Sequence, residues 1–396
     1  MKIKFKEIAN FVAGQSPQSK YYTENEGTPF LQGNRTFGQF YPEIDTYTTK
    51  VTKMAKKGDI LMSVRAPVGD LNFAPTDLCI GRGLSSITAK DGNNDFLFYA
   101  LKYNIENLKK QSNGTTYDSV NKDIVENMEM IIPDQDDTKI KVTKLLKNID
   151  NKIENNNKIN VQLESMAKTI YDYWFLQFEF PNEEGKPYKS SGGKMVWNEV
   201  LKREIPEGWE CKKLNEVFDF IKGKTPDKLF DKRDDELIEY LTIEAVNSET
   251  IQYCSKESMV TTSGEVLMVM DGAASSDVYV GNIGVIGSTF CKLEIKNNYV
   301  DNNFLFLIMK KLEPIFKKVN TGSTVPHANK NYINNFKICL PKDAELRFEL
   351  QQNIVSCINK IVKNKEQNQE LTSLRDFLLP LLMNGQVGFK QVALAE

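Results

Sequence analysis

The sequence predicts an α/β (α+β) fold that occurs twice: two globular domains joined by two long antiparallel helices, which form a coiled coil with pseudo-two-fold symmetry. The segment GTTYDSVNK at 114–122 is similar to GSTVPHANK at 322–330, which lies 208 residues later. Each copy precedes a short apolar segment, a proline (Pro133 or Pro341) and a long helical pattern. Both helices keep their apolar positions at the same spacing. The chain therefore contains a duplicated unit with two similar faces.

The long helices are predicted from apolar residues at heptad-like spacing. Asparagines interrupt each apolar seam, Asn156 and Asn160 in the first helix and Asn364 and Asn368 in the second. Seam asparagines weaken a coiled coil but fix its register, so we expect the two helices to pair with each other. The alternative is that each helix packs separately on its own domain. The corresponding seam positions are Val142, Leu146, Ile153, Leu163, Met166 and Ile170 in the first helix and Leu350, Ile354, Ile361, Leu371, Leu374 and Leu378 in the second.

The domain boundaries follow from charge and turn residues. Asp134, Asp136 and Asp137 precede or open the first helix, where acidic groups interact favourably with the helix dipole. Proline, glycine and serine gather between the first helix and the second domain, which is typical of a linker. We expect a first domain at 1–135, a long helix at 136–176, a linker at 177–205, a second domain at 206–343, a second long helix at 344–384 and a C-terminal tail at 385–396.

Composition favours a globular protein of the reducing cytoplasm. The chain has 396 residues, of which 40% are hydrophobic and 26% charged, with a formal net charge of -2. Its six cysteines are scattered, with no C-x-x-C pair, which argues against a disulfide framework and a cysteine zinc site. No apolar stretch is long enough for a membrane span or a signal peptide, so we expect no membrane association. Any DNA surface must arise from local segregation of charge.

The motifs of several enzyme classes are missing from the sequence. No Pro-Pro pair exists, so the Asn-Pro-Pro-(Tyr/Phe) and Asp-Pro-Pro-Tyr motifs of amino-methyltransferases are absent. Gly223-Lys224-Thr225 is similar to the end of a Walker A motif, but Phe218 stands where the first glycine is needed. His327 is the only histidine, which excludes a two-histidine metal or acid–base site. We therefore expect no catalysis, cofactor or metal in this chain.

Repeated loops supply the candidate DNA contacts. The segment 5–17 is similar to 214–226, and its glycine and proline mark a turn that presents polar residues. The Gly-Thr/Ser-Thr loops offer amides and hydroxyls to phosphate oxygens, and the following lysine adds a charge. Asn121 and Asn329 either pair with adenine or cap a turn. The candidate DNA-binding residues are Gln15, Ser16, Lys20, Asn34, Arg35, Ser63, Arg65, Arg82, Thr115, Thr116, Asn121, Lys122, Lys222, Lys224, Thr225, Lys228, Asp271, Ser275, Ser323, Thr324, His327, Asn329 and Lys330.

One loop differs between the two copies. Ser63-Val64-Arg65-Ala66 follows a predicted strand in the first domain, and Val269-Met270-Asp271-Gly272 takes its place in the second. An arginine at this place can bridge a guanine or a phosphate, whereas an aspartate accepts a hydrogen bond from a cytosine amino group. Different residues on equivalent loops predict two different half-sites, and hence an asymmetric DNA target.

Several segments resemble those of the specificity subunits of type I restriction–modification enzymes. The sequence YKSSGG…MVWN…IPEGW at 188–209 resembles the family's entry into its second target recognition domain. The segments 5–17, 63–69 and 114–116 are similar to recurring recognition-domain segments. The resemblance covers essentially the whole chain and rests on the order, spacing and duplication of these motifs. It implies two recognition domains, each followed by a long conserved helix.

The resemblance also implies a function and partners. It implies a protein that is not itself a catalyst and that binds double-stranded DNA at a bipartite target, one half per recognition domain. Such a protein holds two methyltransferase subunits and, through them, two restriction subunits. S-adenosylmethionine, ATP and Mg²⁺ are then expected only in these partner subunits, which methylate adenine and cleave DNA.

Other interpretations of the same residues remain. A stand-alone architectural or regulatory DNA-binding protein would bind its site tightly without partner subunits. A coiled-coil scaffold that never touches DNA would show no steep dependence of binding on salt. The missing motifs disfavour a nuclease or methyltransferase in its own right.

Overall fold

The computed structural model describes residues 1–65, 67–112, 120–247, 251–256, 260–322 and 324–389. The chain divides into two compact units. The first contains Met1–Asn151 together with the residues from Leu371 onward, and the second contains Lys152–Glu370. Each long helix therefore contributes to both units. In these described ranges, no helix is long and apolar enough to cross a membrane.

The first unit has three sheets. A four-stranded antiparallel sheet has the order β2-β10-β7-β8, and a five-stranded sheet has the order β3-β5-β4-β9-β6 with one parallel pair, β4 and β9. The short strands β1 and β11 pair with each other, and α2 packs against β10 and β11. The elements are β1 (Lys2–Lys4), α1 (Phe5–Ile8), β2 (Ala9–Ala13), η1 (Ser19–Tyr21), β3 (Tyr22–Thr23), β4 (Thr28–Leu31), β5 (Tyr47–Thr48), β6 (Met54–Ala55), β7 (Ile60–Ser63), β8 (Leu71–Phe73), β9 (Leu78–Ile80), β10 (Leu84–Ala89), α2 (Asn94–Ser112), α3 (Lys122–Asn127) and β11 (Glu129–Ile131).

The second unit repeats this plan. Its antiparallel sheet β15-β22-β19-β20 matches β2-β10-β7-β8, and its sheet β17-β16-β21-β18 again has one parallel pair, β16 and β21. The pair β14 and β23 matches β1 and β11. The elements are η2 (Asp172–Leu176), β12 (Met195–Asn198), β13 (Arg203–Pro206), β14 (Trp209–Lys213), η3 (Leu214–Glu216), β15 (Phe218–Lys222), β16 (Leu237–Leu241), α5 (Ile243–Val246), β17 (Gln252–Ser255), β18 (Val260–Thr261), β19 (Val266–Val269), β20 (Val278–Tyr279), β21 (Gly284–Ile286), β22 (Phe290–Ile295), α6 (Asn302–Lys318), α7 (Lys330–Asn335) and β23 (Lys337–Pro341).

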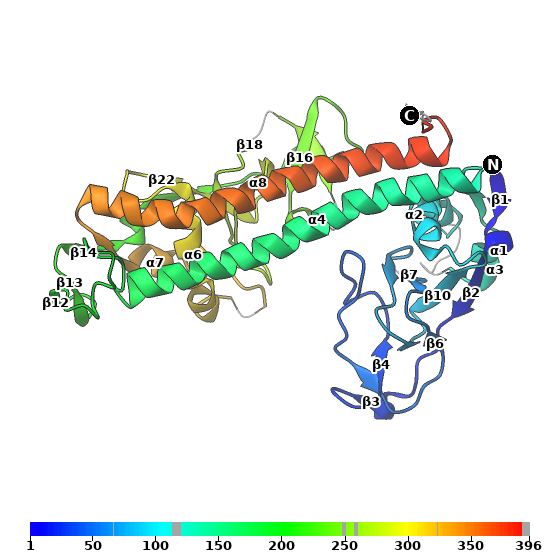
Figure 1. Cartoon of the computed structure of the whole chain (residues 1–396), viewed down its shortest axis with the longest axis horizontal. Coiled ribbons are helices and arrows are strands. Elements are labelled where there is room, and N and C mark those ends of the chain that lie inside the picture. Colours follow the sequence, from blue (N-terminus) through cyan, green and yellow to red (C-terminus); the bar gives the residue numbers. More distant parts are fainter. Residues whose placement is uncertain (66, 113–119, 248–250, 257–259, 323, 390–396) are drawn as a thin grey trace, which may run out of the picture. The chain divides into compact units, whose positions relative to one another are not determined.

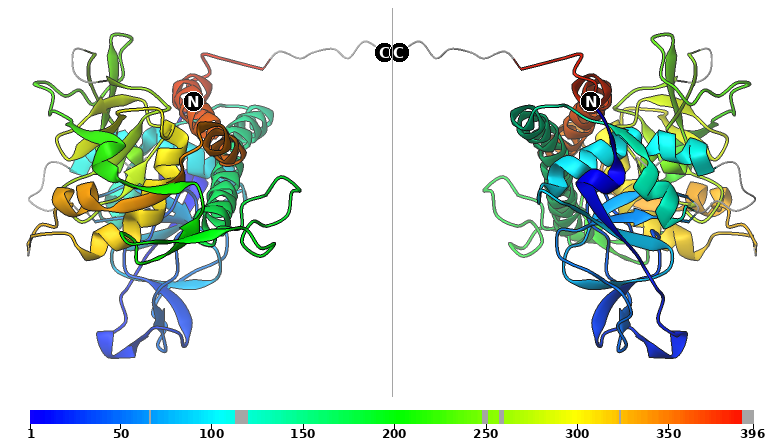
Figure 2. Two further views of the ribbon diagram at one scale, coloured as in Figure 1. Left: turned by 90° about the vertical axis from the view of Figure 1, so that its left-hand side faces the viewer. Right: turned by 90° about the vertical axis from the view of Figure 1, so that its right-hand side faces the viewer.

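The two long helices, α4 (Asp136–Tyr171) and α8 (Ala344–Met383), pack together. Figure 1 draws them side by side, and the end-on views of Figure 2 agree. Asn156 Nδ2 donates to Asn368 Oδ1 at 2.8 Å, and Asn364 Nδ2 donates to Asn160 Oδ1 at 2.8 Å. Residue numbers rise along α4 as they fall along α8, so the helices are antiparallel. The predicted coiled coil is confirmed.

These asparagine contacts have the internal two-fold symmetry of the sequence. At the spacing of 208 residues, Asn156 corresponds to Asn364 and Asn160 to Asn368. The bond from Asn156 to Asn368 is therefore the equivalent of the bond from Asn364 to Asn160. Three of the four side chains are buried, so a shift of register would leave polar groups without partners.

The predicted apolar seam is correct at most positions and wrong at one equivalent pair. Val142, Leu146 and Ile153 are buried, as are Leu350, Ile354 and Ile361 in the second helix. Met166 and Leu374, which correspond to each other, are instead 54% and 46% exposed. Ile170 and Leu378, the next predicted positions on each helix, are partly buried and pack against the core clusters, so the error is confined to this one pair.

The segment between α4 and the second domain is folded against the second unit. Strands β12 and β13 form a hairpin, and the rings of Phe178 and Phe180 pack on Trp209. Phe178 has a φ of 64°, which is unusual for a residue with a side chain. Arg203 lies over its ring, with 4.7 Å between the guanidinium carbon and the ring centroid.

Candidate nucleic-acid interface

In each unit, a loop at the end of the four-stranded sheet lies beside the described C-terminal part of the repeated segment, which begins at Val120 in the first unit. The amide of Val120 donates to Val64 O at 3.0 Å in the first unit, and the amide of Ala328 donates to Met270 O at 2.8 Å in the second. The neighbouring residues Arg65 and Asp271 thus occupy equivalent places. The loop at which the two copies of the sequence diverge thus makes the same backbone contact in both units.

In each unit, a turn that contains a glycine lies at the same end of the sheet as this loop. The amides of Gly14 and Gly223 donate to Leu84 O and Phe290 O, at 2.9 and 3.0 Å. A Cβ atom on Gly14 would stand 2.2 Å from Gly81 O, and one on Gly223 would stand 2.3 Å from Gly287 O. No other residue fits at either place, because a backbone carbonyl cannot move aside as a flexible side chain can.

The glycine turn places polar residues next to the divergent loop. In the first unit, Ser16 Oγ accepts from the amide of Arg82 at 3.0 Å, and the amide of Val64 donates to Gly83 O at 3.0 Å. Arg82 and Arg65 are thereby brought to one edge, with Gln15 preceding Ser16 in the same turn. In the second unit, Thr225 Oγ donates to Ser288 Oγ at 3.1 Å, and the amide of Met270 donates to Thr289 O at 2.7 Å.

The predicted basic residues of the first unit fall into two groups. Lys20, Arg65 and Arg82 are exposed, and within the described ranges none of them forms an ion pair. Arg35 instead pairs with Asp45, and the Arg35 hydrogen bond lowers the pKa of that carboxyl below its usual value. Two further predicted residues also have partners: Lys122 lies 3.4 Å from Glu126, and Asn34 donates to Asp70.

The predicted lysines of the second unit are also uncompensated. Lys222, Lys224 and Lys228 are exposed and form no ion pair among the described residues. Lys330 Nζ lies 5.3 Å from the centroid of the Phe220 ring. Lys222 and Lys330 both line an open cavity of about 340 Å³, together with Met270, Asp271, Cys291, Thr321, Ala328, Asn329 and Asn331. A lysine-lined, open hollow at a loop edge suits a phosphate oxygen or the edge of a base.

Asp271, one of the residues that line this cavity, contacts His327. Asp271 Oδ1 is 2.7 Å from His327 Nδ1. The His327 amide donates to Thr321 O at 2.7 Å, and the Thr321 amide donates to His327 O at 2.9 Å, so the repeated segment closes as a narrow loop. Thr324 is exposed within it. Predicted residues Thr115, Thr116 and Ser323 lie outside the described residues.

Two predicted contact residues are buried, and two others cap helices. Ser63 and Ser275 are buried, so their hydroxyls hold the loop rather than face solvent. Ser63 Oγ donates to Pro67 O at 2.7 Å. Asn121 and Asn329 cap α3 and α7, because their Oδ1 atoms accept from the amide of the third residue of each helix, Ile124 and Tyr332. Of the two alternatives for these asparagines, the cap is the one observed.

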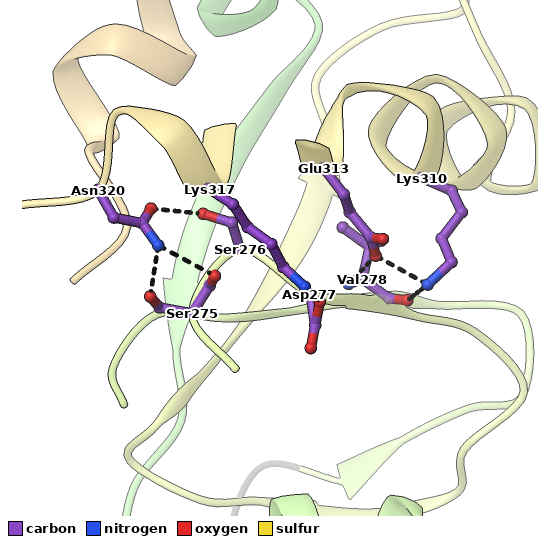
Figure 3. A network of polar contacts seen from close by, with 8 residues as sticks. All are labelled: Ser275, Ser276, Asp277, Val278, Lys310, Glu313, Lys317 and Asn320. Carbon is purple, nitrogen blue, oxygen red and sulfur yellow. Dashed lines mark hydrogen bonds and ion pairs between the residues drawn. The ribbon is translucent and has the colours of Figure 1, made fainter. Parts of the chain in front are cut away.

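Sequence reasoning missed the residues that hold the divergent loop of the second unit (Figure 3). Asn320 Nδ2 donates to Ser275 Oγ at 2.7 Å, and Ser276 Oγ donates to Asn320 Oδ1 at 2.8 Å. Ser276 has a φ of 79°, so this bond stabilises a conformation that residues with side chains rarely adopt. Asn320 lies just before the repeated Gly322 segment, but no local pattern indicates a contact 45 residues away.

The helix α6 supplies the second half of this network (Figure 3). Glu313 Oε1 accepts from the amide of Val278 at 2.6 Å and from Lys310 Nζ at 2.8 Å. Burial raises the pKa of Glu313 despite these donors. Lys317 pairs with Asp277. The loop is thus held on a helix, which limits its freedom before any ligand binds.

The described residues contain no group of three or more histidine, cysteine, aspartate or glutamate side chains that could hold a metal ion. The six cysteines are all free, and burial raises the pKa of the Cys339 thiol to about 12. The candidate site in each copy of the fold is therefore the loop edge with its exposed basic residues.

This architecture defines an internally duplicated α/β protein with two equivalent loop edges and a pair of long helices that pack together. The family model for the type I restriction modification DNA specificity domain matches the chain twice, at 1–165 and 206–373. The chain therefore belongs to the specificity (S) subunit family of type I restriction–modification systems.

Individual relatives agree with the family match. The chain is 26% identical to the type I restriction enzyme MjaIX specificity subunit of Methanocaldococcus jannaschii, over 98% of this chain and 94% of that protein. It is 24% identical to the HindI specificity subunit of Haemophilus influenzae, over 85% and 88%. A further M. jannaschii protein is 41% identical over 162 residues, which are 40% of this chain and only 38% of that protein.

A solved structure shares the fold. The crystal structure of the type I restriction–modification S subunit from M. genitalium matches with a TM-score of 0.55 at 17% identity, over 96% of this chain and 95% of that one. The predicted fold class, two α/β domains with paired long helices, is confirmed.

Proposed function

We propose that this chain binds double-stranded DNA at a bipartite, asymmetric target, one half-site per recognition domain, without being a catalyst itself. The observation that carries the proposal is the pair of equivalent loop edges. Their backbone geometry is the same, whereas Arg65 stands on one edge and Asp271 on the other. Shared geometry suits a shared grip on the DNA backbone, and different side chains suit different bases.

The methylated sequence tests this proposal directly. The chain is co-expressed with the adenine methyltransferase subunit of its system, and modified adenines in genomic DNA are located by sequencing. We expect two different half-sites separated by unspecified bases, because Arg65 donates and Asp271 accepts. Arg65→Ala should relax the first half-site only. A palindromic motif, or a motif with one continuous half, would contradict the proposal.

The uncompensated lysines predict how binding depends on salt. Replacing Lys222 or Lys224 by alanine should weaken duplex binding and reduce the slope of log K against log salt by about 1 for each phosphate that no longer binds a lysine. The measurement is duplex affinity at several salt concentrations. Lys186→Ala is the matched control, because Lys186 is also exposed but pairs with Glu184 in the segment before the second domain. Equal slopes in all variants would favour a scaffold that does not touch DNA.

The same proposal includes two methyltransferase subunits as partners, and restriction subunits through them. Exposed apolar residues on α4 and α8 support two copies of one partner, because they recur at the spacing of 208 residues. Ile140 and Phe348 are 60% and 63% exposed, and Met166 and Leu374 form the second equivalent pair. Single exposed apolar residues are common on protein surfaces, so the support comes from their recurrence at equivalent places on the two helices rather than from exposure alone. Each unit thus offers one member of each pair.

Charge placed on the equivalent pair should disrupt assembly. We expect the double variant Met166→Glu, Leu374→Glu to lose most of the methyltransferase subunit that co-purifies with the chain, because burying a carboxylate in an apolar contact is costly. The control is Val51→Glu, Leu229→Glu, which changes one exposed apolar residue per unit outside the helices. Loss of co-purification in the control alone, or in neither variant, would argue against helix docking.

A further inference from the structure

Three polar side chains meet in the interior of the first unit, where α2, α4 and α8 come together. Tyr99 donates from its hydroxyl to Asp150 Oδ2 at 2.6 Å, and Arg375 Nη1 donates to Asp150 Oδ1 at 2.9 Å. The Asp150 side chain is 2% exposed and that of Arg375 is 12% exposed. Arg375 also contacts its neighbour Asp376, and burial lowers the pKa of the adjacent Lys102.

The equivalent place in the second unit is entirely apolar. At the spacing of 208 residues, Tyr99 corresponds to Leu307, Asp150 to Ile358, and Arg375 to Ala167. All three of these apolar residues are buried in the core cluster of the second unit. The triad Tyr99–Asp150–Arg375 therefore breaks the internal two-fold symmetry at a buried position, whereas the paired asparagines obey it.

This difference matters because the two halves of the chain are alike. An internal two-fold arrangement can in principle also form from two copies of one half, with α4 of one chain against α4 of another. The asparagines do not oppose this, since Asn156 would then face Asn160 of the other copy. They fix the register of the helices but do not identify the partner helix.

We propose that the triad Tyr99–Asp150–Arg375 selects the pairing of α4 with α8 and disfavours the pairing of like helices. With α4 against a second α4, Ala167 would stand in the place of Arg375, and buried Asp150 would keep only Tyr99. With α8 against a second α8, Arg375 would stand in the place of Ala167, among Leu307 and Ile358. In the first like pairing the buried Asp150 loses its charged partner, and in the second Arg375 keeps only its exposed neighbour Asp376. Both are costly, whereas the observed pairing joins the two buried charges.

The test makes both ends of the helix pair alike. The full chain with Tyr99→Leu, Asp150→Ile and Arg375→Ala has the same three residues in the first unit as in the second. A mixture of ¹⁴N and ¹⁵N chains is unfolded, refolded together and treated with a lysine cross-linker. A cross-link with both isotopes joins two different chains. Mass spectrometry then gives the ratio of mixed-isotope α4–α4 cross-links to all α4–α8 cross-links.

We expect this ratio to be at least about tenfold higher in the triple variant than in the unaltered chain, because the penalty for like pairing has been removed. An unchanged ratio in a folded variant would overturn the proposal. If the triple variant does not fold, Asp150→Asn with Arg375→Gln removes both charges, with the same shape at position 150 and a shorter but still polar side chain at position 375. That variant should also raise the ratio, and no increase would overturn the proposal equally.

Discussion

Replacing Arg375 by alanine should lower the free energy of unfolding of the first unit by about 3–5 kcal/mol, the usual effect of removing one partner of a buried ion pair. The loss comes mainly from Asp150, whose carboxylate would remain buried with only the Tyr99 hydroxyl as a donor. Packing also suffers, since the Arg375 side chain is itself only 12% exposed. We expect no other single change on the helix pair to cost more.

Because the chain has two units, one unfolding midpoint would mix their contributions. Hydrogen exchange of separate peptides avoids this. Protection should fall for α2 residues 96–105 of the first unit and stay unchanged for the equivalent residues 304–313 of the second. Asp376→Ala is the control, because it removes the exposed contact of Arg375 and leaves the bond to Asp150. Asp150→Ile added to Arg375→Ala should restore much of the protection, since no buried charge then remains. If Arg375→Ala and the double variant lose protection from hydrogen exchange equally, an unpaired carboxylate is not the cause.

The repeat, the long helices and their antiparallel pairing could be predicted from the sequence, because helix periodicity and internal similarity are local properties. The triad could not. Asp150 lies 51 residues from Tyr99 and 225 from Arg375. In the helical pattern Asp150 and Arg375 look like ordinary surface charges, and only the tertiary fold buries them together.

The candidate interface, too, could be predicted from the sequence only in part. The glycine turns, the repeated loops and the divergence between Arg65 and Asp271 could be predicted, because short motifs recur in order. Which hydroxyls face solvent could not. Ser63 and Ser275 have the composition of phosphate contacts, but the loops use their hydroxyls internally. A serine next to a tight turn satisfies the backbone first, and this preference depends on loop geometry.

Replacing Gly223 by alanine should abolish recognition by the second unit and destabilise its four-stranded sheet by roughly 2–3 kcal/mol, as overpacking against an immobile neighbour does. The new Cβ would lie 2.3 Å from Gly287 O and 2.5 Å from Ile286 O. Both oxygens belong to the backbone where β21 ends, so the strand end itself must move. This shift would break the bond from the Lys224 amide to Ile286 O and displace Lys224 and Thr225.

The duplication provides matched experiments for this prediction. Gly14→Ala repeats the change in the first unit, where the Cβ would lie 2.2 Å from Gly81 O. Each variant should lose protection from hydrogen exchange, and contact with its half of the DNA target, in its own unit only. Gly264→Ala in the second unit and Gly33→Ala in the first are the controls, because a Cβ there meets nothing within 4 Å. If both glycine-turn variants bind DNA as the controls do, the turns do not position the interface, and the basic residues of each unit would have to act independently of the turns.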